Sequence, residues 1–425
     1  MERYSSYKDS GISWIGEIPE HWELRHLSQV SYEHYISNKE VHHQNLLSLS
    51  YGRIKRKDIN TTEGLLPASF DTYQIVEDGN IVMRLTDLQN DHKSLRVGLV
   101  KEEGIVTSAY VCLGVYDSIF PSYLYNVLHS YDIKKLFYSM GGGLRQNLNW
   151  QGLKKLDIPL PPKDEQQAIV AYIEEKCQMI DAYVADKEKE IELLQELKQK
   201  TIADAVTKGL NPNVKMKDSG ISWLGMIPEH WEVSRMKRVF SEAKEKTTDE
   251  SGTLLSLSQY TGITLKGNAK KVGMFEAEST IGYNIVHPGQ FVMNIMLAWN
   301  GSYGVSDYEG IISPSYCVFN FNEDFERKYF HYLLRLPSYA GAFKTMSKGI
   351  IESRLRLYPL YFFTFKTIIP PLDEQQAIVF YIEEKCQKID TLITELQAEI
   401  DYLKEYKQRL IADVVTGQVN VQNEI

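Results

Sequence analysis

The chain has 425 residues, a net charge of −9 and a hydrophobic content of 43%, which is typical of a globular protein with more than one domain. No apolar run reaches the ~18 residues that a membrane helix needs, and the first residues do not form a signal peptide, so we expect a cytoplasmic protein without a membrane segment. The cysteines Cys112, Cys177, Cys317 and Cys386 form no CxxC pair, which favours reduced thiols over disulfides or a zinc site.

A short aromatic and proline-containing segment opens each half of the chain. Residues 8–24, KDSGISWIGEIPEHWEL, return at 217–233 as KDSGISWLGMIPEHWEV, with 14 of 17 positions identical and an offset of 209 residues. We interpret this tryptophan motif as a clasp that packs the beginning of each half against a helix. His21 and His230 have no partners at metal-ligand spacing, so a metal or catalytic role is not expected.

The regions that follow, 25–160 and 234–369, differ much more in sequence but keep matching landmarks. The LLSLS run at 46–50 is repeated at 254–258, and short runs of strand-forming residues bounded by Gly and Asp occur in both regions. The landmarks are strands at 80–84 and 290–294, and helical patterns at 121–139 and 325–346. Each region is therefore predicted to be an α+β domain of ~135 residues.

A second repeat begins a long helical pattern after each domain. Residues 164–181, DEQQAIVAYIEEKCQMID, match 373–390 at sixteen of eighteen positions, again with an offset of 209 residues. Proline pairs precede both copies, and helices are predicted over 165–207 and 374–416. The predicted N-caps are Asp164 and Asp373, the predicted capping-box partners are Gln167 and Gln376, and the predicted stop signals are Gly209 and Gly417.

Both helices carry apolar residues at spacings of three and four, the pattern of a coiled coil. Neither helix would be stable alone with one apolar stripe, so we expect each to pair with the other. The seam weakens to Lys198, Thr201 and Ala205 at the end of the first helix, and an insertion at 201–209 is therefore expected to lengthen the pair at little cost in packing. The principal seam residues are Ile173, Ile180, Val184, Ile191, Leu194, Ile382, Ile389, Ile393, Leu396, Ile400 and Leu403.

The negative charge lies in these helices. Segment 165–207 has ten acidic and five basic residues, and segment 374–416 has nine acidic and five basic, which leaves the rest of the chain neutral. Local basic loops in the two domains can therefore still bind DNA. Arg, Lys, Asn and Gln are the side chains that contact phosphates and read G and A edges. The candidate DNA-binding residues are Arg53, Lys55, Lys57, Asn90, Lys93, Arg96, Arg145, Gln146, Asn147, Lys266, Asn268, Lys270, Lys271, Lys348, Arg354 and Arg356.

Motifs of catalysis are missing from the sequence. It contains no GxxxxGK[ST] phosphate loop, no HExxH zinc motif and no [DN]PP[YF] tetrapeptide of amino-methyltransferases. We therefore predict a chain with no catalytic residues and no metal site.

The paired WxGxIPxHW motifs, the paired PPxxEQxxI helix starts and RLTDLQND at 84–91 resemble the specificity subunit of a type I restriction-modification enzyme, from Lys8 to Gly417. The resemblance implies an α+β fold with two pseudo-repeated target-recognition domains, separated by two long antiparallel helices that form a coiled coil. The corresponding boundaries are 1–162 for the first domain, 163–209 for the first helix, 210–371 for the second domain, 372–417 for the second helix, and 418–425 for a tail.

The resemblance also implies binding to an asymmetric, bipartite site on double-stranded DNA, and assembly with two modification subunits and with restriction subunits. S-adenosylmethionine, ATP and Mg would be used by those partners, and none would be bound by this chain. Two alternatives stay open from the sequence: a scaffold that binds only proteins, and a DNA enzyme with an unrecognised site.

Overall fold

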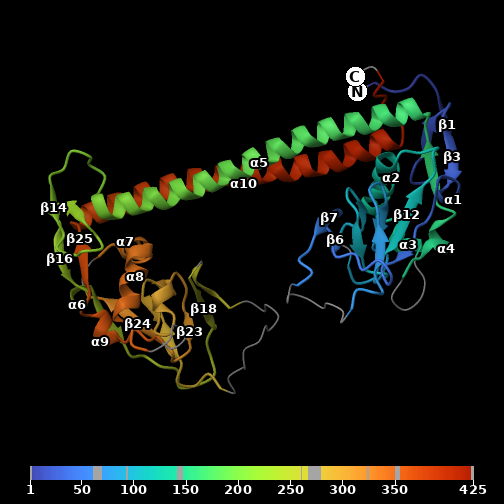
Figure 1. Ribbon diagram of the computed structural model, residues 1–425. Coiled ribbons are helices and arrows are strands. Elements are labelled where there is room, and N and C mark those ends of the chain that lie inside the picture. Colours follow the sequence, from blue (N-terminus) through green and yellow to red (C-terminus); the bar gives the residue numbers. More distant parts are fainter. Residues whose placement is uncertain are drawn as a thin grey trace. The chain divides into compact units, whose positions relative to one another are not determined.

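The computed structural model describes residues 2–60, 69–91, 94–140, 147–259, 261–266, 279–322, 325–349 and 355–422. The chain divides into two compact units. Unit 1 comprises Met1–Glu188 and Gln397–Ile425, and unit 2 comprises Lys189–Leu396. The long helices α5 (Lys163–Lys208) and α10 (Leu372–Val415) each continue from one unit into the other (Figure 1). Unit 1 is thus built from two separate stretches of chain, whereas unit 2 is one continuous stretch.

Unit 1 contains a four-stranded antiparallel sheet in the order β10–β9–β12–β4 and a three-stranded sheet in the order β11–β8–β5. Hairpin β6–β7 and the pairs β1–β2 and β3–β13 complete its strands. The elements are β1 Tyr7–Asp9, β2 Glu17–Pro19, β3 Glu23–His26, α1 Leu27–Val30, β4 Ser31–Glu33, β5 Ile36–Ser37, β6 Leu47–Ser50, β7 Arg53–Arg56, β8 Gln74–Val76, β9 Ile81–Met83, β10 Val97–Leu99, β11 Gly104–Val106, β12 Val111–Val115, α2 Pro121–Ile133, α3 Phe137–Met140, α4 Trp150–Leu153 and β13 Asp157–Leu160.

Unit 2 repeats this arrangement, because its four-stranded sheet has the matching order β22–β21–β24–β17, with hairpin β18–β19 and pairs β14–β15, β16–β25 and β20–β23. The predicted α+β class and internal repeat are therefore confirmed. The elements are β14 Met216–Asp218, β15 Met226–Pro228, β16 Glu232–Arg235, α6 Met236–Val239, β17 Phe240–Ala243, β18 Leu255–Ser258, β19 Gly262–Leu265, β20 Asn284–Val286, β21 Phe291–Asn294, η1 Ala298–Asn300, β22 Tyr303–Val305, β23 Gly310–Ile312, β24 Tyr316–Phe321, α7 Arg327–Leu334, α8 Pro337–Met346, α9 Pro359–Phe362 and β25 Lys366–Ile369.

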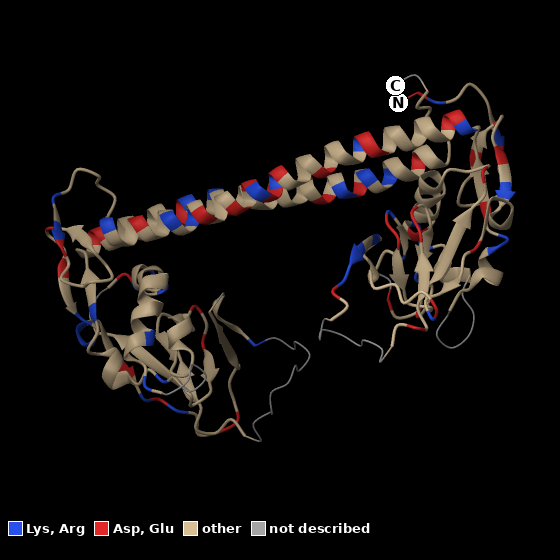
Figure 2. Ribbon diagram, viewed as in Figure 1, with Lys and Arg blue, Asp and Glu red and all other residues tan. Residues whose placement is uncertain are grey.

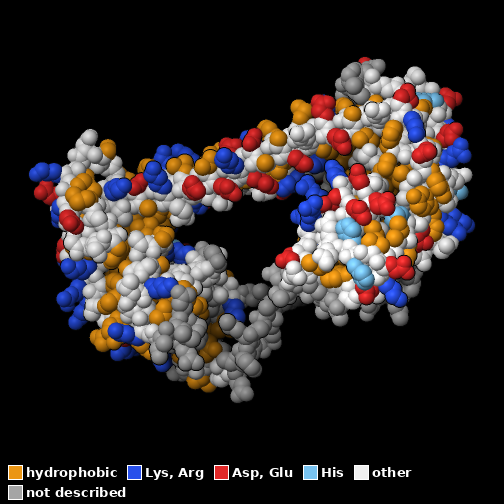
Figure 3. All heavy atoms as spheres, in the orientation of Figure 1, with side chains coloured by type: hydrophobic (Ala, Val, Ile, Leu, Met, Phe, Trp, Pro, Cys, Tyr) orange, Lys and Arg blue, Asp and Glu red, His pale blue; other side chains and the backbone are white. Residues whose placement is uncertain are grey.

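Helices α5 and α10 run antiparallel within each unit, and every seam residue named from the sequence is buried or half-buried. Charged side chains of both signs are distributed along the visible face of the pair (Figure 3). Exposed ion pairs contribute little stability, but they report the register of the two helices. The pairs are Lys407 Nζ with Asp181 at 2.6 Å and Lys404 Nζ with Glu188 at 3.1 Å in unit 1, and Lys198 Nζ with Asp390 at 2.6 Å in unit 2.

The helix starts differ from the predicted caps. Because α5 begins at Lys163, Asp164 lies inside the first turn, as Asp373 does in α10, and Gln167 and Gln376 are exposed. The buried neighbour Gln166 takes the linking role instead: its Oε1 accepts from Phe120 N at 2.9 Å, and its Nε2 donates to Pro161 O at 2.9 Å. Gln375 does the same with Glu326 N and Pro370 O.

The helix ends also differ in part from expectation. Gly209 and Gly417 adopt left-handed φ values of 74° and 75°, as the predicted stop signals require. The end of α5 is not loosely packed, however, because Ala205 and Val206 are buried in the core of unit 2 and the Tyr329 hydroxyl donates to Val206 O at 2.9 Å. An insertion at 201–209 would therefore break the core of unit 2, which corrects the expectation drawn from the weak seam.

The segment from residue 418 is not a free tail. Val419 and Val421 are buried in the core of unit 1, and Asn420 N donates to Glu2 O at 2.9 Å.

The tryptophan motif of each unit packs against its helix start, as the clasp interpretation predicts. Trp22 is fully buried, and its Nε1 donates to Glu165 Oε1 at 3.1 Å in the first turn of α5. Trp231 is also fully buried and donates to Glu374 Oε2 at 2.9 Å in α10. The two carboxylates differ in exposure, since the Glu165 side chain is 1% exposed and the Glu374 side chain 35%. Loss of the indole N–H donor should therefore reduce stability more in unit 1 than in unit 2.

We expect Trp22→Phe to lower the free energy of opening of the α5 start by about 1.5–3 kcal/mol, because a buried carboxylate loses a donor that water cannot replace. Trp231→Phe removes equivalent atoms from a position that is also fully buried, so it is the matched control and should show the smaller loss. Hydrogen exchange of segments 163–175 and 372–384 in the full chain measures both effects. Equal losses in the two variants would contradict this account.

Candidate nucleic-acid interface

Hairpin β6–β7 presents a row of cations on its outer face. Ile54 packs inward against a buried apolar cluster, and because strand side chains alternate, Arg53, Lys55 and Lys57 share the opposite, exposed face. The basic colouring of β7 is visible in Figure 2. Arg56 follows Ile54 on the other face but is also exposed, and it is held by Glu102, whose two carboxylate oxygens each lie 2.8 Å from Arg56 Nε. Lys55 and Lys57 are thus available for phosphates. Arg53 lies 3.9 Å from Asp181 of α5 at an exposed position, and Arg56 is paired with Glu102.

The equivalent hairpin β18–β19 has the same frame with a different surface. Its register pairs Leu255 with Leu265, as β6–β7 pairs Leu47 with Arg56. The positions that correspond to Arg53, Lys55 and Lys57 are therefore Gly262, Thr264 and Lys266. Only the last of these is basic, and Lys266 is exposed. The two units therefore present different side chains on equivalent hairpins.

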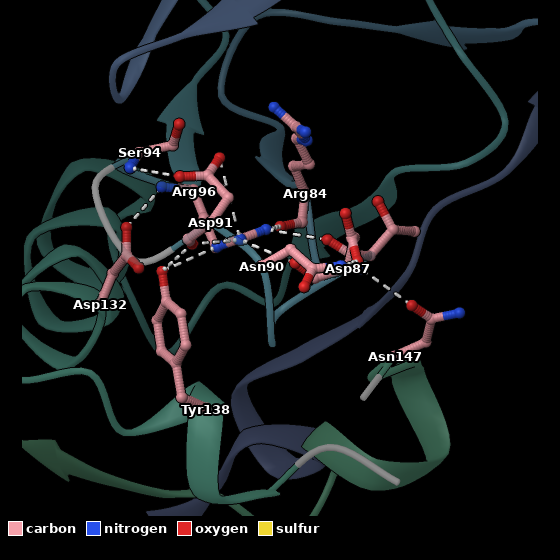
Figure 4. Close-up of polar contacts among 10 residues, drawn as sticks. Arg84, Asp87, Asn90, Asp91, Ser94, Arg96, Asp132, Tyr138 and Asn147 are labelled. Atoms are coloured by element: carbon pink, nitrogen blue, oxygen red, sulfur yellow. Dashed lines mark hydrogen bonds and ion pairs between the residues drawn. The ribbon is translucent and has the colours of Figure 1, made fainter. Parts of the chain in front are cut away.

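Arg96 is not at the surface, which corrects its assignment as a DNA contact. The side chain has no exposed area, and the guanidinium lies at the centre of the loop between β9 and β10 (Figure 4). It donates to the backbone oxygens of Arg84 at 3.1 Å, Thr86 at 2.9 Å, Asp87 at 3.4 Å and Asp91 at 2.6 Å, and to the Tyr138 hydroxyl at 3.0 Å. Arg96 thereby shapes the loop from within rather than contacting a ligand.

Two other candidates are tied to the same loop by Asp87. This residue has a left-handed backbone with φ 56°, a conformation that aspartate tolerates. Its N–H donates to Asn147 Oδ1 at 2.9 Å, and its Oδ1 accepts from Asn90 Nδ2 at 2.8 Å. Both amides are exposed and held in place, so each can present its remaining polar groups outward.

Sequence reasoning missed Arg84, at the end of β9. Its guanidinium points away from the Arg96 cluster in Figure 4, and within the described part of the chain its side chain has no hydrogen bond or ion pair. The signal was present, since Arg84 begins the RLTDLQND stretch. In unit 2 the corresponding residue is Asn294, which is buried and accepts from Met296 N. Arg84 is therefore a basic group special to unit 1.

In unit 2, Lys348 and Arg356 form a two-residue antiparallel bridge by mutual backbone hydrogen bonds of 2.9 Å. Lys348 is exposed, with its Nζ 5.2 Å from the centre of the Tyr361 ring, and Arg356 is half-buried. The remaining candidates lie outside the described residues: Lys93, Arg145, Gln146, Asn268, Lys270, Lys271 and Arg354.

Over the described ranges, no group of three or more His, Cys, Asp or Glu side chains could hold a metal ion, and no helix is long and apolar enough to cross a membrane. The four cysteines are free thiols, and burial raises the pKa of Cys112 to about 12. That thiol is a packing residue and not a nucleophile.

The comparisons with known proteins agree on one family. Residues 99–193 match the family described as "Type I restriction modification DNA specificity domain". The chain is 24% identical to the putative type I restriction enzyme MjaX specificity subunit of Methanocaldococcus jannaschii, covering 96% of both chains, and 24% identical to the MjaVIII specificity subunit of that organism, covering 82% of this chain and 81% of the relative. The chain is therefore similar to type I restriction-modification specificity subunits.

Solved structures share the fold of this chain. The HsdS subunit from Thermoanaerobacter tengcongensis matches with a TM-score of 0.51 at 15% identity, covering 95% of this chain and 98% of that one. A chain from a structure of complex assembly and conformational transition of the type I R-M system matches with a TM-score of 0.62 at 16% identity, covering 95% and 99%. The relatives are named as specificity subunits, in agreement with the prediction that this chain is not itself an enzyme.

We expect Arg96→Ala to destabilise the β9–β10 region by about 3–5 kcal/mol, because it leaves buried carbonyl groups without their charged donor. Arg53→Ala is the control, since the Arg53 side chain is 73% exposed and its loss should change stability by less than about 0.5 kcal/mol. Hydrogen exchange of residues 81–99 in the full chain reports the difference. A fully protected Arg96→Ala loop would show that the buried guanidinium is dispensable.

The neighbouring Asp132 predicts a pH dependence. Burial raises the pKa of its carboxyl from 3.8 to about 6, although the hydrogen bond from Arg96 N opposes the rise. Because the folded pKa is the higher one, the ionised form weakens the fold, and stability from this group falls as pH rises from about 4 to about 6. Relative to Asp132→Asn, the free energy of unfolding of the wild type should fall by about 3 kcal/mol over that pH range, at ~1.36 kcal/mol per pKa unit. Denaturant unfolding at pH 4 and pH 7 tests this, and a constant difference would contradict it.

Proposed function

We propose that this specificity subunit binds an asymmetric, bipartite site on double-stranded DNA, with one half-site read by each unit. The observation that carries the proposal is the pair of matched hairpins with unlike outer faces. Arg53 and Lys55 stand where unit 2 has Gly262 and Thr264. Two domains of one frame with different surfaces suit a target whose halves have different sequences.

The chemistry of the exposed groups supports contact with the duplex. Cations in a row on a strand neutralise phosphates, release counterions and make binding steeply dependent on salt. Amides that are fixed at one side and free at the other, such as Asn90 and Asn147, can read base edges, because bidentate pairing needs a defined orientation. A scaffold that binds only proteins would show no such salt dependence.

We further propose that two modification subunits assemble on this chain and transfer a methyl group from S-adenosylmethionine to adenine N6. Restriction subunits that use ATP and Mg would join that complex. A target adenine has to leave the base stack for methylation, so the partners have to close around DNA that this chain holds. The role assigned to the specificity subunit is to select the sequence, and the chemistry belongs to its partners.

The deciding experiment is sequencing of methylated sites in cells that carry this chain and its partner subunits. One bipartite sequence with unlike halves and a fixed gap is expected. Replacing 25–160 with the corresponding region of a relative should change one half-site and leave the other intact. Methylation with no common sequence, or a change in both halves, would refute recognition by two independent readers.

The helix pair predicts how the gap is set. Inserting seven residues after Glu188 in α5 and seven after Leu396 in α10 keeps the heptad phase and avoids the core at Ala205. Each helix lengthens by about 10 Å, which corresponds to about three base pairs at ~3.4 Å each.

The gap in the methylated sequence should therefore grow by about three base pairs while both half-sites stay the same. The control carries the insertion in α5 only. This shifts the apolar residues of α5 relative to those of α10 and should reduce pairing of the two helices. A folded double-insertion protein with an unchanged gap would show that the helices do not set the spacing.

A further inference from the structure

The start of α5 in unit 1 is closed by a tyrosine from the beginning of the chain. The Tyr4 hydroxyl donates to Glu165 Oε1, the same oxygen that accepts from Trp22 Nε1, while His21 Nε2 lies 2.9 Å from Glu165 Oε2. The Tyr4 ring centre is 5.9 Å from that of Trp22 and 5.7 Å from that of His21. With Tyr4 in place, the Glu165 side chain is only 1% exposed.

The equivalent place in unit 2 lacks this ring. At the repeat offset of 209 residues, Asn213 stands where Tyr4 does in unit 1. Glu374 keeps the other two partners, Trp231 and His230, but its side chain is 35% exposed. The carboxylate of unit 2 therefore has the two inner donors of its counterpart and open surface on its outer side.

A cavity of about 170 Å³ lies over this carboxylate. We call it the Glu374 notch, and its walls include Gly209, Val214, Pro228, His230, Glu374 and Ala377. An engineered apolar cavity of about 150 Å³ takes up benzene, so the notch is large enough for one aromatic ring. Its walls combine apolar groups with the Glu374 carboxylate, a pair of features that suits a phenol. They also include Asn211 and Lys208, whose Nζ is paired with Asp204 at 2.7 Å.

The tryptophan motif and the helix start differ in a few side chains between the two units. Glu17, Lys163 and Ala171 of the first copy are replaced by Met226, Leu372 and Phe380 in the second. These three side chains are 50%, 39% and 71% exposed. At these three positions the exposed surface of unit 2 is therefore more apolar than that of unit 1.

We propose that the Glu374 notch receives a tyrosine side chain of a modification subunit, with the phenol donating to Glu374 as Tyr4 does to Glu165. This rests on the proposed function, which supplies that partner. The carboxylate disfavours a phosphate and hence DNA. A second copy of this chain cannot supply Tyr4, because Tyr4 is 9% exposed within its own unit. The aromatic therefore comes from another protein, and the notch gives that protein a contact in unit 2 that unit 1 fills by itself.

The experiment uses the full chain and the purified modification subunit encoded with it. Ala377→Trp fills the notch. Gln376→Trp places the same side chain one residue away, about 100° around α10 and outside the notch walls; both positions are exposed. Affinity for the modification subunit should fall about tenfold or more in Ala377→Trp, as expected for loss of an aromatic anchor, and stay within about twofold in Gln376→Trp.

A direct probe of the notch is 4-fluorophenol, followed by fluorine NMR. Saturable binding to the wild type and to Gln376→Trp, with loss in Ala377→Trp, supports the assigned chemistry. Equal affinity of all three proteins for the modification subunit would overturn the proposal, and so would equal phenol binding. A wild type that fails to bind the modification subunit at all would instead refute the proposed assembly, and with it this occupant.

Discussion

A carboxylate in the first turn of each long helix, bonded to the indole of the tryptophan motif, is the contact on which the rest of the structure depends. Negative charge is favoured at this end of a helix, because the first N–H groups have no partners within the helix. Glu165 therefore stabilises α5 and receives Trp22 at the same time. The same device in α10 fixes the tryptophan motif of unit 2 to Glu374, which lies 143 residues after Trp231 in the chain. Each domain is thereby anchored at both of its ends.

This anchoring separates the parts of the chain that maintain the fold from the parts that can vary. The tyrosine that donates to the last turn of a helix, Tyr123 to Val415 and Tyr329 to Val206, occurs in both units. The hairpin surfaces do not repeat in this way. Arg96 and Asp132 are charged residues buried in unit 1, where they shape a loop. Unit 2 has no equivalents of them by residue type. Charge in this protein is therefore no guide to function unless burial is known.

The repeats explain why much of the fold follows from sequence alone. The seam and the two helices are periodic over many residues, so the positions of Ile173 and Ile400 could be predicted from spacing. Arg96 could not be placed, because a basic residue in a polar loop looks the same whether it is exposed or buried. The caps at Asp164 and Asp373 were misplaced by two residues, since Gln166 and Gln375 bond to groups distant in sequence. The role of Tyr4 could not be predicted from the sequence either, because it depends on Glu165, which is 161 residues away.

The division of the chain into units has a consequence for the order of events during synthesis. Unit 2 is continuous and ends at Leu396, so all of its residues can leave the ribosome together. Unit 1 begins the chain but requires Val414, Val419 and Val421 in its core. Domains generally fold from the N-terminus as they are made. Here the first domain has to wait for the last segment, and its incomplete core stays exposed while the second domain forms. A ribosome that stops at residue 396 would release a complete second unit attached to an unfinished first one.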